Sequence, residues 1–276
     1  MFVRLALCGL AASLMTGCAV LGPRSPSGWT LTWSDEFDGP AGASFDGTKW
    51  VAETGGQGWG NQEREYYTTR PENVALDGQG HLVITARAEP PGSAFSCWYG
   101  PCRYTSARLK TQGRFMQAYG RFEARIRIPR GQGMWPAFWM LGDDIDRVGW
   151  PASGEIDVME NIGREPNVVH GTMHGPGYSG AAGIGGPDTL AHGAFADDFH
   201  VYAVEWSPGE IRWLVDDRPY FRTTPASLPP GTRWVYDHPF FLLLNLAVGG
   251  GWPGDPDAAT TFPQQMIVDY VRVYRR

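Results

Sequence analysis

The 276-residue sequence has no long run of lysine or arginine, and its formal net charge is −6. Binding to nucleic-acid phosphates needs clustered positive charge, so no nucleic-acid partner is expected. Long amphipathic helices are missing as well, because no long stretch has the helical spacing of apolar residues. The sequence has instead 37 Gly and 22 Pro without a collagen-like period, which is typical of many turns between short strands.

Cysteine is scarce, with four residues in the whole chain. Cys8 and Cys18 lie close to the N-terminus, and Cys97 and Cys102 form a C-x4-C pair. Further zinc ligands are not evident around that pair, so a zinc site is not favoured. In an exported chain the spacing predicts a local disulfide that staples a loop and takes no part in chemistry.

The N-terminus has the features of a targeting segment. Its apolar stretch, Leu5 to Leu14, is too short to span a bilayer, which needs about 20 residues. The sequence Leu14-Met15-Thr16-Gly17-Cys18 resembles a bacterial lipobox, although Met15 stands where leucine is usual. We expect export to the cell envelope as a lipoprotein acylated on Cys18, with plain secretion as the alternative. The expected segments are a signal peptide over residues 1–17 and a lipid-anchored tether over residues 18–28.

From Trp29 onward no linker or repeat interrupts the sequence, so residues 29–276 are expected to form one domain. Short apolar or alternating runs between Gly- and Pro-containing turns predict an all-β sandwich. The expected strands are Thr30–Trp33, His81–Ala86, Gly120–Ile128, Ala137–Leu141, Glu155–Glu160, Val168–His174, His200–Trp206, Glu210–Val215, Phe240–Ala247 and Met266–Tyr274. The run from Arg121 to Ile128 alternates charged and apolar residues, which predicts a strand with one solvent-exposed face. Most of the 12 Trp, 11 Tyr and 13 Phe are expected in the core, and an exposed subset would suit a carbohydrate cleft.

The most informative segment is Glu155-Ile156-Asp157-Val158-Met159-Glu160. On a strand, Glu155 and Asp157 share a face, and strict alternation would turn Glu160 away from it. One extra residue at Val158–Met159, a β-bulge, would return Glu160 to that face. Three neighbouring carboxylates repel one another, so at least one pKa must rise. Such an arrangement is costly for a purely structural strand.

Two such glutamates favour a retaining glycosidase, in which the nucleophile and the acid lie about 5–5.5 Å apart. Along a bulged strand Glu155 and Glu160 are nominally ~13 Å apart, and two long side chains that lean toward a shared sugar can close this gap. Asp157 between them can hydrogen-bond the nucleophile and help keep Glu160 protonated. A solvated strand face and a calcium site are the alternative interpretations.

These residues resemble the signature of glycoside hydrolase family 16, in its laminarinase-like branch with the bulged E-x-D-x-x-E. Lichenase-type members lack the extra residue. The resemblance spans Trp29 to Tyr274 and implies a β-jelly roll of two curved antiparallel sheets with a concave cleft for a polysaccharide. Further segments that resemble the family, in the same order, are Gly58-Trp59-Gly60-Asn61-Gln62-Glu63, Thr105-Ser106-Ala107-Arg108-Leu109-Lys110-Thr111, Trp135-Pro136-Ala137-Phe138-Trp139-Met140-Leu141 and His170-Gly171-Thr172-Met173-His174.

By matching position, the resemblance implies that Glu155 is the nucleophile, Asp157 the helper and Glu160 the general acid/base. It also implies a set of substrate-binding residues. For each of them a structural role is the alternative: core packing, a turn, an ion pair, or, for Glu63, the orientation of a neighbour. The substrate-binding set is Asn61, Glu63, Arg108, Trp135, Trp139, His174 and Trp252.

The resemblance further implies one structural calcium on the convex face, with ligands from Glu36, Gly80 and Asp269, and no cofactor for catalysis. The expected activity is endo-hydrolysis of β-1,3-glucan, with mixed-linkage glucan as a further substrate, by a monomer. The alternatives are a galactan hydrolase acting on agar or carrageenan, and a transglycosylase. A noncatalytic β-glucan-binding protein is disfavoured because all three acids are present.

Overall fold

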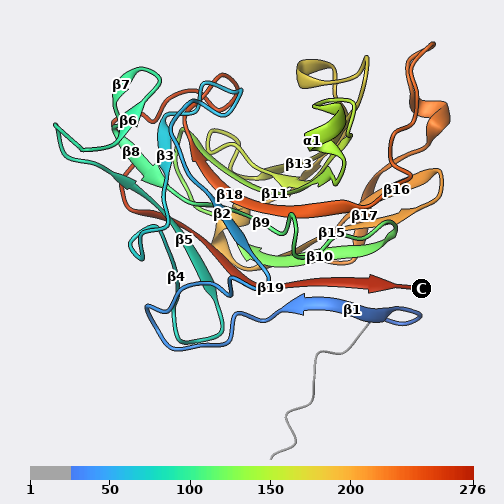
Figure 1. Cartoon of the computed structure of the whole chain (residues 1–276), viewed down its shortest axis with the longest axis horizontal. Coiled ribbons are helices and arrows are strands. Elements are labelled where there is room, and N and C mark those ends of the chain that lie inside the picture. The colour runs from blue at the N-terminus through green and yellow to red at the C-terminus, as the bar shows by residue number, and fades with distance from the viewer. Residues whose placement is uncertain (1–25) are drawn as a thin grey trace, which may run out of the picture.

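The computed structural model describes residues 26–276, which form two stacked β-sheets with connecting loops gathered above one of them (Figure 1). This confirms the prediction of an all-β sandwich. The outer sheet comprises β1 (Thr30–Asp35), β3 (Glu65–Tyr67), β4 (Val74–Leu76), β5 (Leu82–Ala88), β8 (Tyr104–Ser106), β10 (Gly120–Arg127), β15 (His200–Ser207), β16 (Glu210–Val215), β17 (Arg218–Thr223) and β19 (Gln264–Arg275).

The strand order of the outer sheet is β17-β16-β15-β10-β19-β5-β8-β3, with β1 paired to β19 and β4 paired to β5. Its pairs are antiparallel, except that β3 and β8 run parallel. The inner sheet comprises β2 (Val51–Glu53), β9 (Arg108–Lys110), β11 (Met134–Gly142), β12 (Glu155–Glu160), β13 (Val168–His174), β14 (Ile184–Thr189) and β18 (Phe240–Val248).

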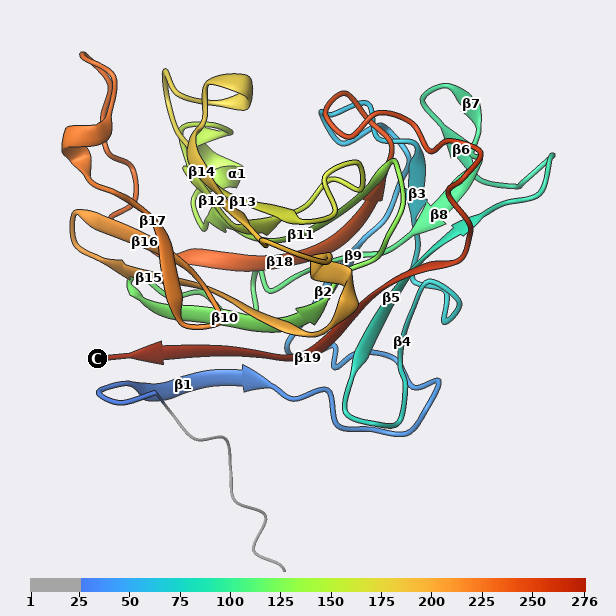
Figure 2. The ribbon, with the colours of Figure 1, turned by 180° about the vertical axis from the view of Figure 1, so that it is seen from behind.

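The inner sheet is antiparallel, in the order β14-β13-β12-β11-β18-β9-β2, so the strand with the three acids lies away from both edges. Figure 2 shows from behind how this sheet curves beneath the loops. The small elements are a hairpin of β6 (Ser96–Cys97) and β7 (Gly100–Pro101), helix α1 (Ile145–Val148), and the 3-10 turns η1 (Gly180–Ala182), η2 (Phe195–Asp197) and η3 (Pro225–Ser227).

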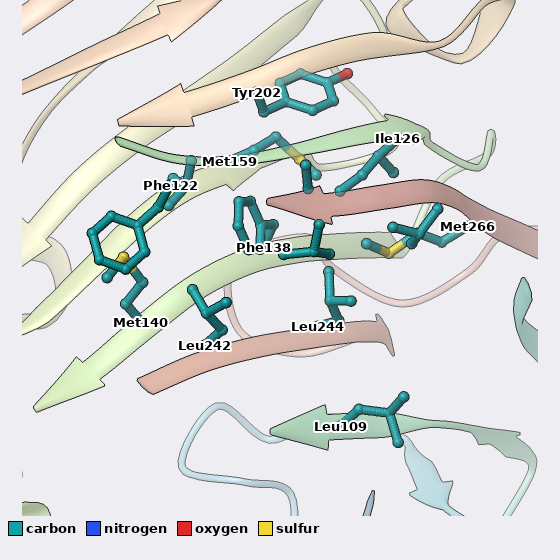
Figure 3. Close-up of a cluster of buried hydrophobic side chains, with 14 of the residues drawn as sticks. Leu109, Phe122, Ile126, Phe138, Met140, Met159, Tyr202, Leu242, Leu244 and Met266 are labelled. Atoms are coloured by element: carbon teal, nitrogen blue, oxygen red, sulfur yellow. The ribbon is translucent and has the colours of Figure 1, made fainter. Parts of the chain in front are cut away.

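The hydrophobic core fills the space between the two sheets (Figure 3). Every residue of β18 is buried, as its nearly continuous apolar sequence requires. On the other face of the inner sheet, Leu141, Phe241 and Leu243 form a second small cluster. The labelled core residues in Figure 3 are Leu109, Phe138, Met140, Met159, Leu242 and Leu244 of the inner sheet and Phe122, Ile126, Tyr202 and Met266 of the outer sheet.

The solvent-exposed face expected for the run from Arg121 to Ile128 is wrong in its first half, while Arg125 is partly exposed and Arg127 is exposed. Arg121 and Glu123 are almost fully buried. Their strand β10 lies between β15 and β19, and the Arg121 guanidinium is bound by Glu123 at 2.6 Å, Asp217 at 2.6 Å and Glu205 at 3.3 Å. Charged side chains can be buried when they are paired with opposite charges. Alternation of charged and apolar residues therefore does not by itself distinguish a solvent-exposed strand face from a buried face whose charges are paired.

The expectations for the N-terminal segment, including Cys8 and the acylation of Cys18, fall outside the described residues. Within residues 26–276, no helix has the length and apolar character that crossing a membrane would require.

Candidate active site

The predicted bulge is present in β12. Phe138 of β11 pairs with Met159, and the next residue, Trp139, pairs with Asp157, so Val158 has no partner on β11. The main-chain carbonyl of Asp157 accepts a hydrogen bond from Nε1 of Trp213 at 2.7 Å. Trp213 belongs to β16 of the outer sheet, so a side chain from the opposite sheet satisfies a polar group beside the bulge.

The bulge sets the direction of every side chain in this strand. Ile156, Val158 and Met159 all belong to the core between the sheets. Two consecutive core residues bring Glu160 back to the face that carries Glu155 and Asp157, on the side of the loops. The strand β13 supports this geometry through Gly171, because a Cβ there would lie 2.3 Å from the Trp213 ring.

Each glutamate of β12 has an indole as its hydrogen-bond donor. Nε1 of Trp150 donates to Oε2 of Glu155 at 2.8 Å, and Nε1 of Trp135 donates to Oε1 of Glu160 at 3.0 Å. His174, opposite Glu155 on β13, places Nε2 at 3.0 Å from Oδ2 of Asp157 and at 3.8 Å from Oε1 of Glu155. The three acids and His174 therefore form one cluster, as the sequence predicts for these positions.

Burial is the largest cause that raises the pKa of all three acids, and for Glu155 and Glu160 the charges of neighbouring acids add to it. The pKa of Glu155 is raised to about 8 and that of Asp157 to about 7. The pKa of Glu160 is raised well above its ordinary value, by burial first and then by the charges of Asp157 and Glu155. His174 and the Trp150 N–H act in the opposite direction on Glu155. Near neutral pH the cluster therefore retains protons, and Glu160 is a group that can donate one.

One wall of the site is a chain of hydrogen bonds that begins at Trp139. Its Nε1 donates to Oδ1 of Asn245 at 2.7 Å, and Nδ2 of Asn245 donates to the Tyr67 hydroxyl at 3.1 Å. That hydroxyl donates to Oε2 of Glu63 at 2.8 Å, and Nδ2 of Asn61 donates to Oε1 of Glu63 at 3.1 Å. Glu63 is buried, so the structure favours its alternative role, in which it orients Asn61.

Arg108 lies between two indoles. Its guanidinium is 4.7 Å from the centroid of the Trp59 ring and 4.8 Å from that of Trp139. Its Nε donates to Oε2 of Glu53, directly opposite on β2, at 2.5 Å. The expected cross-strand ion pair is thus present, and Arg108 holds both aromatic rings in place by cation–π contact.

A second aromatic group flanks Glu160. Trp135 and Trp252 are in edge contact, with ring centroids 5.5 Å apart, and His170 contacts Trp252 at 5.2 Å. Trp252 is partly exposed. The main chain of its loop lies against the loop that carries Asn61, since a Cβ on Gly250 would lie 2.9 Å from the Asn61 carbonyl oxygen, and the same Cβ would be in ordinary contact with the Trp135 ring at 3.7 Å.

The predicted calcium ligands lie at the junction of three outer strands. Asp35 pairs with Val271 and Leu82 with Val268, which brings Glu36, Gly80 and Asp269 into one region. Both carboxylate oxygens of Glu36 are bound by Arg272, and Oδ2 of Asp269 is bound by Arg125. The Glu36 carboxylate therefore does not fit a metal ligand. The carbonyls of Glu36 and Gly80 and Oδ1 of Asp269 are the donors that suit calcium, and the site stays a prediction.

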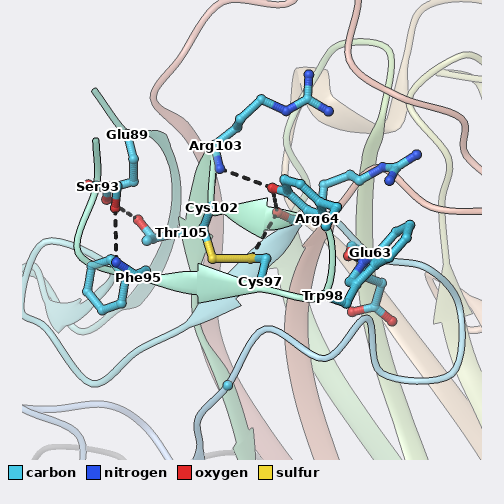
Figure 4. The surroundings of a disulfide bond; sticks show 12 residues. Glu63, Arg64, Glu89, Ser93, Phe95, Cys97, Trp98, Cys102, Arg103 and Thr105 are labelled. Carbon is cyan, nitrogen blue, oxygen red and sulfur yellow. Dashed lines mark hydrogen bonds between the residues drawn. A yellow bond between two sulfur atoms is a disulfide. The ribbon is translucent and has the colours of Figure 1, made fainter. Parts of the chain in front are cut away.

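Cys97 and Cys102 form the predicted disulfide, which closes the β6–β7 hairpin (Figure 4). The hairpin braces the loop that carries Asn61. Nε1 of Trp98 donates to the carbonyl of Glu63 at 2.8 Å, and the Tyr99 hydroxyl donates to the carbonyl of Arg64 at 2.5 Å. The predicted loop staple is thus confirmed, and the loop that it braces forms part of the wall described above.

Removing this disulfide by the double substitution Cys97→Ser/Cys102→Ser is expected to lower the free energy of unfolding by about 2 kcal/mol, because a short closed loop is released in the unfolded chain. Urea denaturation followed by fluorescence would measure it. Ser96→Ala, at an exposed position in the same hairpin, is the control and should leave the midpoint unchanged. An unaltered midpoint in the double variant would show that the hairpin contacts alone hold the loop.

Sequence reasoning missed several residues of the site. Trp150, Tyr67, Asn245, Trp59 and His170 all contact the acids or the predicted substrate-binding residues. For Asn245 a signal exists, because it is a lone polar residue in an otherwise apolar buried strand. The others are aromatic or imidazole side chains, whose default interpretation from sequence is core packing. Trp150 is therefore missed although it lies only five residues from Glu155.

Comparisons with known proteins identify the family of this chain. The model of the glycosyl hydrolases family 16 matches residues 61–272. A beta-glucanase of Rhodothermus marinus is 47% identical over 278 residues, which cover 95% of this chain and 92% of that protein. The solved laminarinase catalytic domain of Thermotoga maritima is similar with a TM-score of 0.83 at 48% identity, covering 90% and 98% of the two chains. For an endo-beta-1,3-glucanase of Pyrococcus furiosus the TM-score is 0.83 at 48% identity, covering 89% and 94%.

Proposed function

The chain belongs to family 16 of the glycosyl hydrolases, and on this basis we propose that it hydrolyses internal β-1,3-glucosidic bonds of β-glucans with retention of configuration. The observation that carries the proposal is the bulged strand β12, which places Glu155 and Glu160 on one face with Asp157 between them. The aromatic rings beside the acids, Trp139 next to Arg108 and Trp135 next to Trp252, suit a sugar chain, since sugar rings stack on flat apolar rings.

The first half of the reaction forms a covalent intermediate. The Glu155 carboxylate attacks the anomeric carbon, while Glu160 gives its proton to the oxygen of the leaving sugar, so the glycosidic bond breaks as the new ester bond forms. Burial keeps the pKa of Glu160 high, so its carboxyl group is protonated and can supply the proton. Asp157 and His174, 3.0 Å apart, lie beside Glu155, with Nε2 of His174 at 3.8 Å from Oε1 of Glu155.

The second half returns the enzyme to its starting state. Glu160, now ionised, takes a proton from water, and the water oxygen attacks the anomeric carbon and releases Glu155. Two displacements at the same carbon give net retention. Repulsion between the acids favours the return of the proton to Glu160 as Glu155 regains its charge.

A substrate panel tests the function. Incubation with laminarin, curdlan, lichenan and agarose is expected to release reducing ends from the β-1,3-linked glucans, with an early fall in chain length that marks internal cleavage. Proton NMR of the first product should show the β-anomer before mutarotation. The absence of release from every β-1,3-linked glucan would refute the proposed substrate, and an initial α-anomer would refute retention.

We also propose that the enzyme acts outside the cytoplasm, held to the cell envelope by a lipid on Cys18. The lipobox-like segment supports this, and so does the disulfide of Cys97 and Cys102, because such bonds persist in oxidising compartments. Mass spectrometry of the N-terminal peptide from native cells tests it, and an unmodified Cys18 would contradict it. The monomeric state stays a prediction.

A further inference from the structure

Within the described chain, Glu155 accepts one side-chain hydrogen bond, and its donor is Trp150 at 2.8 Å. Trp150 lies between α1 and β12, five residues before Glu155. The residue is 49% exposed, so core packing does not account for its position. The indole therefore lies at the rim of the site with its polar edge bound to a reacting carboxylate.

The other groups that face Glu155 do not hold its charge firmly. Asp157 and Glu160 of its own strand repel it. His174 of β13 lies 3.8 Å from Oε1, beyond hydrogen-bonding distance. Tyr236, from the loop before β18, has its pKa raised by burial and stays neutral. Among residues 26–276, no lysine or arginine forms an ion pair with Glu155.

We propose that Trp150 is a positioning residue for the nucleophile: its N–H holds Oε2 of Glu155, fixes the plane of the carboxylate and stabilises the ionised form. This inference rests on the proposed function. With Oε2 bound to the indole, Oε1 is the oxygen left to attack the anomeric carbon. A hydrogen bond to an ionised acceptor is stronger than one to a neutral group, so it also favours release of the carboxylate when water cleaves the intermediate.

The pH dependence of the reaction gives a direct test. Attack requires an ionised Glu155, and the N–H donor lowers its pKa. Trp150→Phe removes the donor and keeps an aromatic ring, so the acid limb of kcat/KM should move to higher pH by about one unit. At pH values below that limb, kcat/KM should fall roughly tenfold. The difference should shrink as the pH rises, because Glu155 then ionises without help.

A control distinguishes this role from sugar stacking by the exposed ring. In a Glu155→Ser background the carboxylate is absent, so adding Trp150→Phe should leave the affinity for a laminarin oligosaccharide within about twofold, measured by calorimetry. A tenfold loss of affinity there would show that Trp150 acts on the sugar, and the inference would fail. Trp29→Phe, whose ring packs against Arg276 beside the outer sheet, is the matched tryptophan control and should leave the pH profile unchanged.

The outcomes separate this inference from the proposed function. Wild-type protein that releases no sugar from β-1,3-glucan contradicts the function itself. Active wild-type protein together with an unmoved acid limb in Trp150→Phe contradicts the inference alone. Should the phenylalanine variant fail to fold, 3-benzothienylalanine at position 150 keeps the shape of the indole and removes only the N–H donor, and the same shift of the acid limb is expected.

Discussion

Glu155→Ser is expected to reduce kcat on laminarin by about 10⁴-fold or more, because a hydroxyl without a general base cannot form the glycosyl-enzyme. Burial and the Asp157 charge raise the pKa of Glu155 to about 8, so this acid binds its proton more tightly in the folded chain than in the unfolded chain. Its contribution to stability is therefore greatest below its ordinary pKa of 4.5 and is lost as the pH rises through about 8.

The serine variant should consequently gain stability relative to the wild type as the pH rises over this interval. Thermal unfolding at pH 4.5 and pH 8 measures the gain, and reducing-end assays measure the loss of activity. Glu210→Ser is the matched control, since Glu210 lies on β16 of the outer sheet and its carboxylate forms an ion pair, among residues 26–276, with Arg222 alone. It should keep full activity. Turnover retained by Glu155→Ser would rule out this residue as the nucleophile.

Glu160→Ala is expected to lower kcat/KM on laminarin by about 10³-fold, because the leaving sugar receives no proton. A substrate whose leaving group needs no proton, such as a dinitrophenyl β-laminaribioside, should still form the intermediate at a near-normal rate. Its hydrolysis then stalls for want of a general base. Added azide, which attacks without base assistance, should restore turnover and give a β-glycosyl azide.

The two glutamates are distinguished by the product that azide forms. In Glu155→Ser, azide replaces the nucleophile itself in a single displacement, and an α-glycosyl azide is expected. Proton NMR of the product identifies the anomer. Equal losses of Glu160→Ala on laminarin and on the dinitrophenyl substrate, with no effect of azide, would exclude Glu160 as the acid/base. Neither Glu155→Ser nor Glu160→Ala changes Trp135, whose Nε1 donates to Oε1 of Glu160 at 3.0 Å in the wild type.

Strand prediction from the sequence was best where the pattern was regular and the strand well paired on both sides. β12, β13 and β16 have the bounds that their residue patterns predict. Prediction missed β14 and β17, which contain Pro187 and Pro219. Proline is excluded from most central strands, but β14 and β17 are edge strands, where one side needs no ladder hydrogen bonds. Edge position is a property of the assembled sheet and is not visible in a short segment.

By itself, the sequence determined the bulged acid strand and the local disulfide, because both depend on residues within a few positions of one another. Because side chains alternate along a strand, Glu160 can share the face of Glu155 only if the strand contains one extra residue between them. The surroundings of these acids were decided only by the tertiary structure. Trp213 reaches the carbonyl of Asp157 from the opposite sheet, and Asn245 meets Tyr67 across 178 positions of sequence. Such contacts depend on which strands become neighbours, and no local pattern encodes that.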